Sequence, residues 1–328
     1  MALTIYDIAK MAGTSVSTVS RYLNNKSIRN DNKLKIEKVL EENEFVPNEM
    51  ARALVSKSLK TVAIITVDIR VPHYSITAYT IEQEFTKKGY NVIICNTSGN
   101  VSDSLTYIKN LTKKQIDGIV FVGSIFNDLN NNLEALRLLG NLPVVVANGQ
   151  INSLNSYSVL MDDVYGVEMA YDYLKKKGRK NIVYIQDLDT YSANLKKKGF
   201  TNSLDKENLS YDGKIYKTTH NVEGGIRVVD EILSSKEKVD AIITGEDLVA
   251  VGVINNLKKH GIIVGKDIDV IGYGHSIYNF LTDPVMTSVD NKPVLQATYL
   301  VDLLEKLILG QNVGTIVLRP EMFKGDSA

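Results

Sequence analysis

From residue 61 onward, short apolar runs alternate with longer stretches that have the periodicity of helices. A first series of runs reads "VAIITV", "NVIIC", "GIVFVG" and "PVVVAN", and a second, beginning near residue 158, reads "SVLM", "NIVYI", "AIIT" and "IDVIG". Apolar runs of this length, bounded by turn residues, are typical of parallel strands that are buried on both faces. Two series of about 100 residues each therefore predict an α/β core built from two doubly wound parallel-sheet lobes.

Helical stretches separate these runs and indicate where the crossover connections lie. We expect them at 75–88, 101–113 and 130–140 in the first half, and at 163–177, 192–206, 222–234 and 246–260 in the second. Chain crossings near 155–160 and 284–292, together with a last strand "TIVL" at 315–318, would make each lobe discontinuous. The predicted bounds are 61–156 and 290–314 for lobe 1, and 157–286 and 315–328 for lobe 2.

The first 46 residues have a different pattern and predict a small all-α head of three helices. Thr4 can cap the first helix, with Asp7 in the favourable first turn and Gly13 just past the end. After a minimal turn, Ser15 can cap a second helix that runs through Leu23. The polar segment "NNKSIRNDN" predicts a loop, and "KLKIEKVLEEN" predicts the third helix.

Helix, glycine-containing turn and helix is the helix-turn-helix arrangement, whose second helix enters the DNA major groove N-terminus first. In this second helix, Val19 and Leu23 face inward. The opposite face consists of Val16, Ser17 and Arg21. Small side chains would let that face approach base edges closely, and Arg21 can donate two hydrogen bonds to a guanine. The alternative interpretation is a three-helix structural cap that binds no ligand.

Composition describes an ordinary globular protein of 328 residues, 44% hydrophobic and 23% charged, with a formal net charge of zero. Residues 1–60 hold ten Lys/Arg against seven Asp/Glu, and residues 1–35 hold six against two, a weak indication of an anionic partner. The sequence has no long apolar run and no signal-peptide pattern, so we expect a cytoplasmic protein that does not enter a membrane. A single cysteine, Cys95, forms no internal disulfide.

The segment "TIYDIAKMAGTSVSTVSRYLNN" resembles, nearly position by position, the opening of the LacI/GalR family of bacterial transcription regulators. "FVPNEMARALVSKSLKTVAII" resembles the hinge of that family, and the similarity continues along essentially the whole chain. The resemblance implies a helix-turn-helix domain at 1–46, a hinge helix and linker at 47–60, and a periplasmic-binding-protein-like effector-binding and dimerisation domain at 61–328. It implies a sequence-specific DNA-binding regulator, in the first place a repressor of carbohydrate-uptake or catabolic genes. A small sugar or sugar derivative bound between the lobes would control its affinity for operator DNA.

Within the head, the resemblance implies DNA contacts at Thr4, Tyr6, Ser15, Val16, Ser17, Thr18, Arg21 and Asn24. The hinge segment follows Pro47, and seven or eight residues are too few for a helix to be stable alone in water. In the family, this segment folds only on the operator, pairs with its dimer mate in the minor groove and wedges a leucine between base pairs. The resemblance places that wedge at Leu54, with Asn48 and Ala51 beside it. An ordinary linker is the alternative.

Ligands of open parallel sheets bind beyond the carboxyl ends of the strands. In this sequence the rule selects residues 68–74, Ser124, Asn148, 187–191, 246–247 and 273–275. Family positions imply an effector site with His73 and Tyr74 as aromatic walls. The other contacts implied by family positions are Asn148, Lys196, His220 and Asp247, and the strand-end rule adds Ser124 and His275 to the predicted effector contacts. Simpler roles stay open, since Asp247 can cap the helix that follows it and His73 can be an exposed loop residue.

Two positions depart from the family pattern around the expected effector site. The family commonly has arginine three residues before the "GF" of 199–200, where this chain has Lys196. It commonly has aspartate after "IGY", where this chain continues with Gly274 and His275. Lysine is a point donor rather than a bidentate fork, and glycine removes the carboxylate. A simple sugar, an unusual carbohydrate, a phosphorylated metabolite and a protein corepressor therefore all stay open.

Enzymatic chemistry finds little support in the sequence. Phosphate-loop, dinucleotide-binding, zinc-site and nucleophile-elbow motifs are missing, and the four histidines are scattered, so we expect no cofactor and no metal. The alternative is a cytoplasmic small-molecule binding protein or sugar-modifying enzyme whose N-terminal helices serve only assembly. The last residues, "EMFKGDSA", have no heptad pattern, and we therefore expect a homodimer on a near-palindromic operator.

Leu54→Ala tests the hinge hypothesis. We expect the melting temperature of the regulatory domain to stay nearly unchanged, because a solvated linker leucine buries little surface. Operator affinity should fall markedly, because the kinked DNA would lose its apolar wedge while the cost of unstacking stays. Affinity for random duplex, which rests on phosphate contacts, should change much less. A large drop in melting temperature would instead make Leu54 an ordinary core residue.

Overall fold

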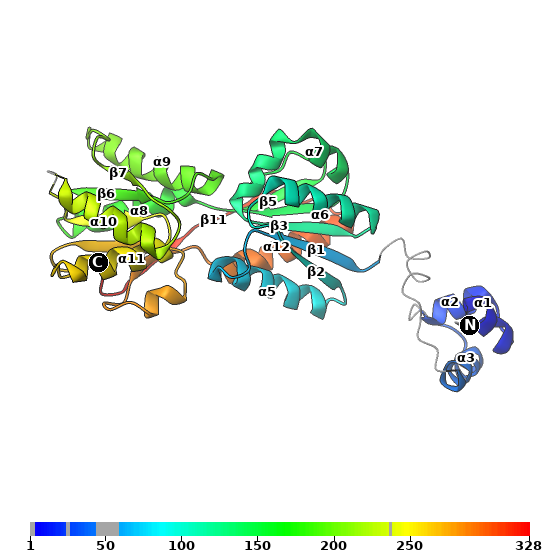
Figure 1. Ribbon diagram of the computed structural model, residues 1–328. Coiled ribbons are helices and arrows are strands. Elements are labelled where there is room, and N and C mark those ends of the chain that lie inside the picture. The colour runs from blue at the N-terminus through cyan, green and yellow to red at the C-terminus, as the bar shows by residue number, and fades with distance from the viewer. Residues whose placement is uncertain (1–3, 24–26, 44–58, 236–237) are drawn as a thin grey trace. The chain divides into compact units, whose positions relative to one another are not determined.

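The computed structural model describes residues 4–23, 27–43, 59–235 and 238–328 (Figure 1). The chain forms two compact units. The smaller comprises Met1–Thr61 with Gln115–Asp117, and the larger comprises Val62–Lys114 with Gly118–Ala328. Helices of the smaller unit and strands and helices of the larger one each enclose a hydrophobic core of their own.

Among its described residues, the smaller unit forms α1 (Ile5–Met11), α2 (Val16–Leu23) and α3 (Asn30–Glu42). The predicted cap of α1 is confirmed. The Thr4 hydroxyl accepts a hydrogen bond from the N–H of Asp7 at 3.3 Å, and the Asp7 carboxylate accepts one from the N–H of Thr4 at 2.9 Å. Gly13 follows the helix with a φ of 61°, a left-handed conformation that glycine adopts without strain.

The second helix begins as predicted, because the Ser15 hydroxyl accepts a hydrogen bond from the N–H of Thr18 at 3.2 Å. Val19 and Ile36 are fully buried and join α2 to α3. The third helix begins at Asn30, inside the segment predicted as a loop, so that prediction was wrong at its end. Asn and Asp have low intrinsic helix propensity, but the apolar face of α3 packs on the core and outweighs it.

Two six-stranded sheets organise the larger unit (Figure 1). The first has the order β2-β1-β3-β4-β5-β11, with β1 (Thr61–Thr66), β2 (Asn91–Asn96), β3 (Gly118–Val122), β4 (Val144–Ala147), β5 (Ser156–Met161) and β11 (Ile316–Leu318). The second has the order β7-β6-β8-β9-β10-β12, with β6 (Ile182–Gln186), β7 (Ile215–Lys217), β8 (Ala241–Thr244), β9 (Asp269–Tyr273), β10 (Thr287–Asp290) and β12 (Glu321–Phe323). From β1 to β11 and from β7 to β10 the neighbours are parallel, whereas β12 pairs antiparallel with β10.

Helices cover both faces of each sheet (Figure 1). In the first lobe, α5 (Pro72–Lys87) packs on α12 (Pro293–Ile308), and α6 (Val101–Lys113) packs on α7 (Leu133–Leu139) beside the 3-10 helix η1 (Ser124–Asn131). In the second, α8 (Asp163–Lys176) packs on α9 (Tyr191–Lys206), α10 (Val222–Ser234) packs on α11 (Asp247–Lys259), and the 3-10 helix η2 (Ile277–Phe280) contacts α11. The helices predicted for this unit are confirmed to within three residues at their ends. None of the described helices is both long and apolar enough to cross a membrane.

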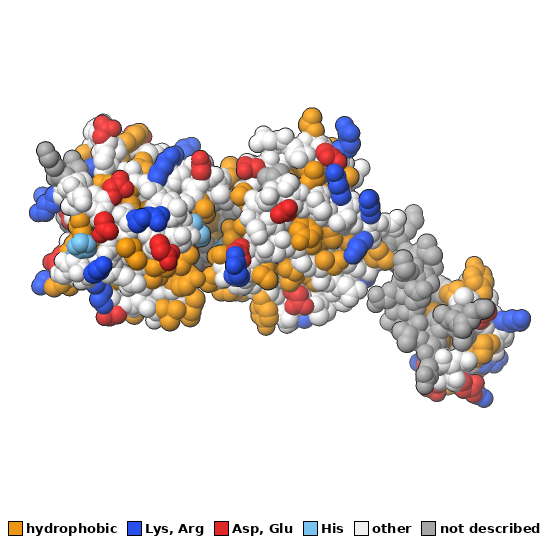
Figure 2. Space-filling view, viewed as in Figure 1, with side chains coloured by type: hydrophobic (Ala, Val, Ile, Leu, Met, Phe, Trp, Pro, Cys, Tyr) orange, Lys and Arg blue, Asp and Glu red, His pale blue; other side chains and the backbone are white. Residues whose placement is uncertain are grey.

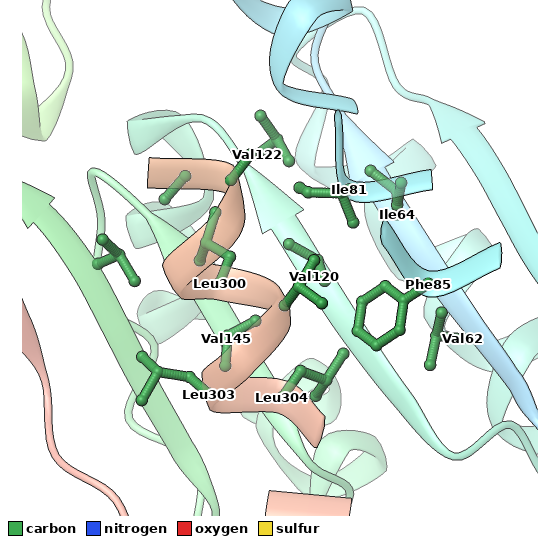
Figure 3. Packing of buried hydrophobic residues seen from close by; sticks show 14 of the residues in the cluster. Val62, Ile64, Ile81, Phe85, Val120, Val122, Val145, Leu300, Leu303 and Leu304 are labelled. Atoms are coloured by element: carbon green, nitrogen blue, oxygen red, sulfur yellow. The ribbon is translucent and has the colours of Figure 1, made fainter. Parts of the chain in front are cut away.

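The buried side chains of β3 show why the first sheet is parallel and covered twice. Val120 packs in one cluster with Phe85 of α5 and Leu304 of α12 (Figure 3). The preceding residue, Ile119, points to the opposite face and is also fully buried. Burial of apolar surface contributes about 25 cal/mol per Å², so a strand buried on both faces is apolar at every position.

Two strands lie in a different lobe from the one predicted. The predicted bounds place 157–161 and 315–318 in lobe 2, but β5 pairs with β4 and β11 pairs with β5, so both belong to the first sheet. The chain therefore crosses between the sheets after β5, after β10 and after β11. The strands β7, β10 and β12 were not predicted, because each has only three or four residues and their sequences include polar side chains.

A pair of leucines in the first lobe tests this account of the core. Leu304→Ala should lower the free energy of unfolding by roughly 2–5 kcal/mol, because it opens a cavity at a fully buried side chain of α12. Leu133→Ala, at a side chain that is 78% exposed, should change it by no more than about 0.5 kcal/mol. Denaturant unfolding of both variants measures the difference. Equal losses would show that Leu304 is not a core residue.

Candidate functional site

The strand order of both sheets places a crevice at a definable point. In the first sheet β1 lies between β2 and β3, and in the second β6 lies between β7 and β8, so successive crossovers leave in opposite directions at these strands. In doubly wound sheets, ligands bind outside the carboxyl ends of the strands at such a switch point. The residues that follow β1 and β3 in one lobe, and β6 and β8 in the other, are therefore the expected lining of this crevice.

A recess of about 480 Å³, its open mouth included, lies at that place. Its lining comes from the segments after β1 (His73, Tyr74), β3 (Gly123, Ser124), β4 (Asn148), β6 (Asp187, Leu188, Thr190) and β8 (Glu246), together with Asp163, Ser192, Ala193, Lys196 and Asn291. Both sheets thus contribute side chains to one recess.

Five of the eight predicted effector contacts line this first recess: His73, Tyr74, Ser124, Asn148 and Lys196. The other three, His220, Asp247 and His275, line a second recess. His73 and Glu246 line both, so the two spaces adjoin. The structure brings the predicted residues together, and their contact with an effector stays a prediction.

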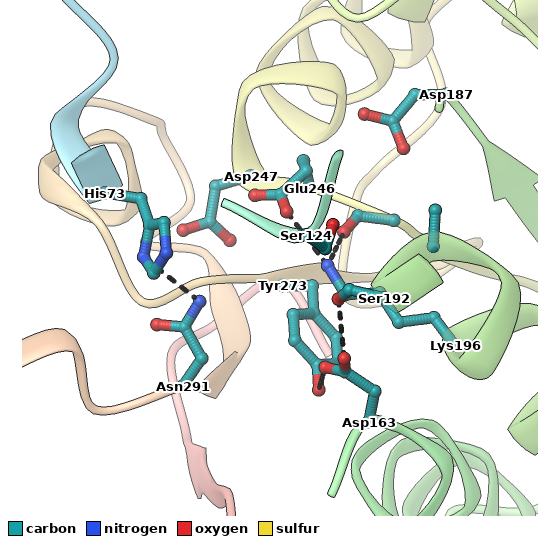
Figure 4. Close-up of polar contacts among 12 residues, drawn as sticks. His73, Ser124, Asp163, Asp187, Ser192, Lys196, Glu246, Asp247, Tyr273 and Asn291 are labelled. Atoms are coloured by element: carbon teal, nitrogen blue, oxygen red, sulfur yellow. Dashed lines mark hydrogen bonds and ion pairs between the residues drawn. The ribbon is translucent and has the colours of Figure 1, made fainter. Parts of the chain in front are cut away.

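Lys196 is buried in α9 and its ammonium is fully engaged by the protein (Figure 4). It donates hydrogen bonds to the carbonyl oxygen of Gly245 at 2.8 Å and to Oε1 of Glu246 at 2.9 Å. It also lies 3.9 Å from the centre of the Tyr273 ring. Burial lowers the pKa of Lys196, but the carboxylates of Glu246 and Asp163 outweigh burial and raise it above its usual value. The charge is therefore held in place by the protein itself.

Asp163 is the most enclosed carboxylate of the first recess. Its oxygens accept hydrogen bonds from the Ser192 hydroxyl at 2.5 Å and from the Tyr273 hydroxyl at 2.6 Å (Figure 4). Burial raises the pKa of Asp163, and Lys196 partly opposes that rise. Sequence reasoning missed this residue, because it lies at the start of α8 after a crossing between lobes and not directly after a strand of its own lobe.

Asp247 has a structural role that the adjacent Glu246 does not share. One of its oxygens accepts from the N–H and the hydroxyl of Ser276, each at 2.8 Å, and the other accepts from the Ser288 hydroxyl at 2.7 Å. Glu246 occupies the N-cap position of α11 but makes no side-chain cap, and turns to Lys196 instead (Figure 4). The strand-end rule had included Glu246, while the family resemblance pointed to Asp247.

The side of the first recess that lobe 1 contributes consists of aromatic rings and of uncharged hydrogen-bond donors. His73 and Tyr74 meet edge to face, with ring centres 5.4 Å apart, and burial lowers the pKa of His73. The Ser124 hydroxyl lies 2.9 Å from the Thr190 hydroxyl of the second lobe. Asn148 accepts two hydrogen bonds at its side-chain oxygen, from the Met161 N–H and from the Gln296 amide, and so can offer a ligand only its amide N–H groups.

The two remaining predicted contacts, His220 and His275, are held by different kinds of interaction. Nδ1 of His220 is hydrogen-bonded to Asp187. Burial lowers the pKa of His220, but this hydrogen bond and the charge of Glu246 outweigh burial and raise it. His275 has a φ of 48° and lies 4.1 Å from the ring of Phe323, centre to centre, which pins its ring at one side of the second recess.

In the head, several predicted DNA contacts are accessible to solvent. Tyr6 is 71% exposed, and Ser15, Ser17 and Arg21 are exposed. Val16 is only half exposed, because it packs partly against the helical core, which corrects the expectation that it belongs wholly to the outer face. The remaining predicted contacts in the head are Thr4, which is exposed, and Thr18, which is half-buried. Asn24, Asn48, Ala51 and Leu54 lie outside the described residues.

Two family models match the chain. Residues 4–48 match the model of bacterial regulatory proteins, lacI family, and residues 58–315 match that of periplasmic binding proteins and the sugar binding domain of the LacI family. An HTH-type transcriptional regulator of Lachnoclostridium phytofermentans is 30% identical over 95% of this chain and 95% of its own. Catabolite control protein A of Priestia megaterium is 33% identical over 88% of this chain and 87% of its own.

Solved structures share the whole architecture. The lac repressor dimer bound to operator and the anti-inducer ONPF has a TM-score of 0.86 at 22% identity, covering 100% of this chain and 99% of that one. A complex of the transcriptional regulator CelR with cellobiose has a TM-score of 0.72 at 20% identity, covering 99% and 100%. A LacI family regulator from Lactobacillus casei with bound glucose has a TM-score of 0.70 at 22% identity, covering 82% and 99%. The predicted helical head and two-lobed α/β core are confirmed.

The His220–Asp187 pair predicts a pH-dependent stability. The pKa of His220 is raised in the folded chain above its unfolded value of about 6.5. Its stabilisation is therefore fully present below that value and is lost as pH rises through the folded pKa. We expect His220→Gln to lower the melting temperature more at pH 5.5 than at pH 8.5. His260→Gln, at a half-exposed histidine, is the matched control, and a loss from His220→Gln that grows with pH would contradict the assignment.

Proposed function

Because the chain belongs to the LacI family of bacterial regulatory proteins, we propose that it represses transcription under the control of a sugar-like effector. Regulation of transcription follows from the family itself. The proposal adds the direction of the control and the place where the effector acts. One observation carries it: side chains from the carboxyl ends of both sheets line a single recess at the switch point of both sheets.

A ligand in this recess would be able to bias the arrangement of the two lobes. The only requirement is that it binds one arrangement more tightly than another, because a ligand with equal affinity for both shifts nothing. His73, Tyr74 and Ser124 belong to the first lobe, while Thr190 and Glu246 belong to the second. Contacts to both groups can be made together only in one lobe arrangement, and this couples effector binding to the conformation of the core.

The head supplies the DNA contact in this proposal. The exposed hydroxyls of Ser15 and Ser17 and the exposed guanidinium of Arg21 lie on α2, the second helix of the helix-turn-helix. In the described structure, Arg21 donates a hydrogen bond to the carbonyl oxygen of Ser27 at 3.1 Å, an exposed contact that a guanine could replace. A homodimer on a near-palindromic operator completes the proposal, supported by the lac repressor structure, which is a dimer bound to operator.

The comparisons favour this function over the alternatives. The relative from Lachnoclostridium phytofermentans is named as an HTH-type transcriptional regulator, which argues against a sugar-modifying enzyme with an assembly module at its N-terminus. Cellobiose and glucose are the ligands of two similar solved structures, and they support a carbohydrate effector for this chain. A protein corepressor forms no part of the proposal, because neither the comparisons nor the described surface supports one.

Operator binding by the full chain tests the proposal directly. We expect a gel-shift titration to show specific binding to the DNA upstream of the protein's own gene, with an affinity that changes when sugars are added. Binding to random duplex of equal strength, or no response to any carbohydrate, would contradict it.

Arg21→Ala tests the head at the level of one contact. It should cost roughly 1–3 kcal/mol of operator affinity and relax the preference for one guanine in each half-site. Lys38→Ala, which removes an exposed cation from α3, is the matched control and should leave that base preference unchanged. Binding titrations against single-base operator variants measure both. An equal loss on specific and random DNA would make Arg21 a phosphate contact.

A further inference from the structure

Two side-chain oxygens of residues that line the first recess accept no hydrogen bond from the described residues. Oε1 of Glu246 accepts from Lys196, and its second carboxylate oxygen makes no hydrogen bond within the described part of the chain. Asn291 is 94% buried and lines the recess, with its amide nitrogen 3.5 Å from Nδ1 of His73. Its side-chain oxygen is buried without a partner among the described residues. A buried polar atom without a partner is costly, so a ligand that donates hydrogen bonds would relieve it.

Charge in the recess opposes an anionic ligand. Asp163, Asp187 and Glu246 line it, and Lys196 is the cation among its lining residues. That cation is occupied by two hydrogen bonds and by the ring of Tyr273, so it has no direction left for a phosphate or carboxylate group. On the face of the larger unit that Figure 2 shows, positive and negative side chains are interspersed.

Position 274 explains why the acceptor comes from Glu246. Gly274 has a φ of 132°, and a Cβ atom there would lie 3.2 Å from Oδ2 of Asp247 and 3.6 Å from Oε2 of Glu246. The aspartate that the family commonly carries at this position would therefore be strained and would add a third carboxylate beside two others. In this chain, the carboxylate at the recess stands instead at the start of α11.

We propose that Glu246 is the main effector-reading acceptor of this chain, and that the site selects an uncharged, hydroxyl-rich ligand against its phosphorylated or carboxylated forms. Asn291 supplies a second acceptor, and Lys196 is a positioning residue that holds Glu246 in place. A hydroxyl donating to a carboxylate makes a short, charge-assisted hydrogen bond, whereas a phosphate oxygen at the same point is repelled. This inference rests on the proposed function, since it names the ligand class of that site.

Matched pairs of ligands test the inference on the full chain. Calorimetric titrations would compare D-glucose with D-glucose 6-phosphate and D-glucuronate, cellobiose with cellobionate, and sucrose with sucrose 6-phosphate. We expect at least one neutral sugar to bind, and its anionic counterparts to bind weaker by a factor of about ten or more. An anionic member that binds as tightly as its neutral counterpart, or the failure of every neutral sugar to bind, overturns the inference.

Glu246→Gln separates a ligand-reading role from a structural one. It should weaken binding of the neutral sugar by a factor of about ten and narrow the discrimination against the phosphate, because Lys196 keeps its charge but loses the counter-charge of Glu246. Glu223→Gln, at an exposed acid in the first turn of α10, is the matched control and should change neither affinity. Unchanged affinities in Glu246→Gln overturn the assignment. If that variant does not fold, Glu246→Asp, with the charge kept and the reach shortened, should weaken the neutral sugar while keeping the discrimination.

Gel shifts on the same preparations test the ligand class and the repressor function separately. Operator binding that responds to a phosphorylated sugar would leave the proposed repressor intact and overturn the ligand class. Loss of specific operator binding in the unmodified chain would overturn the repressor itself, whatever the calorimetry shows.

Discussion

A parallel sheet is stable in water only when helices cover both of its faces, and this constraint organises the larger unit. Crossover helices bring each strand back in the same direction, so all carboxyl ends of the parallel strands meet at one edge. With β1 beside β3 and β6 beside β8, both sheets open at that edge. The recess is a consequence of the same burial that stabilises the lobes, and its lining can vary without disturbing the core.

In the first recess, Lys196 is the cation among the lining residues, and it holds the carboxylate of Glu246 in place. Moving an ammonium out of water costs several kcal/mol, and Lys196 recovers this through Glu246, a backbone carbonyl oxygen and an aromatic ring. An arginine fork in its place could grip a ligand in a bidentate way, whereas the lysine is occupied. The polarity that a ligand meets is therefore set by carboxylate and amide oxygens.

Control of DNA binding requires that a small ligand change the structure beyond its own binding site. The chain passes between the sheets at three described places, after β5, β10 and β11, and these connections are where a change between the lobes can be absorbed. Residues contributed by one lobe only would bind a ligand without biasing that change. The lining from both lobes, with Ser124 facing Thr190, meets the thermodynamic condition for a switch.

Local physical chemistry determined much of this protein from its sequence. Periodicity placed the helices 101–113 and 222–234 at their observed bounds, and Thr4, Gly13 and Ser15 marked the helix ends of the head, because caps and amphipathic faces depend on residues a few positions apart. The strand-end rule likewise selected Glu246 together with Asp247.

Tertiary structure decided the rest. The lobe to which β5 and β11 belong follows from their pairing with distant strands. Glu246 lines the first recess and Asp247 does not. The oxygens of Asp247 are occupied by the hydroxyls of Ser276 and Ser288, which lie 29 and 41 residues further along the chain. Hydrogen-bond partners so far away in the chain leave no periodic signal near the residue they occupy, so only the folded chain reveals which polar atoms are still free for a ligand.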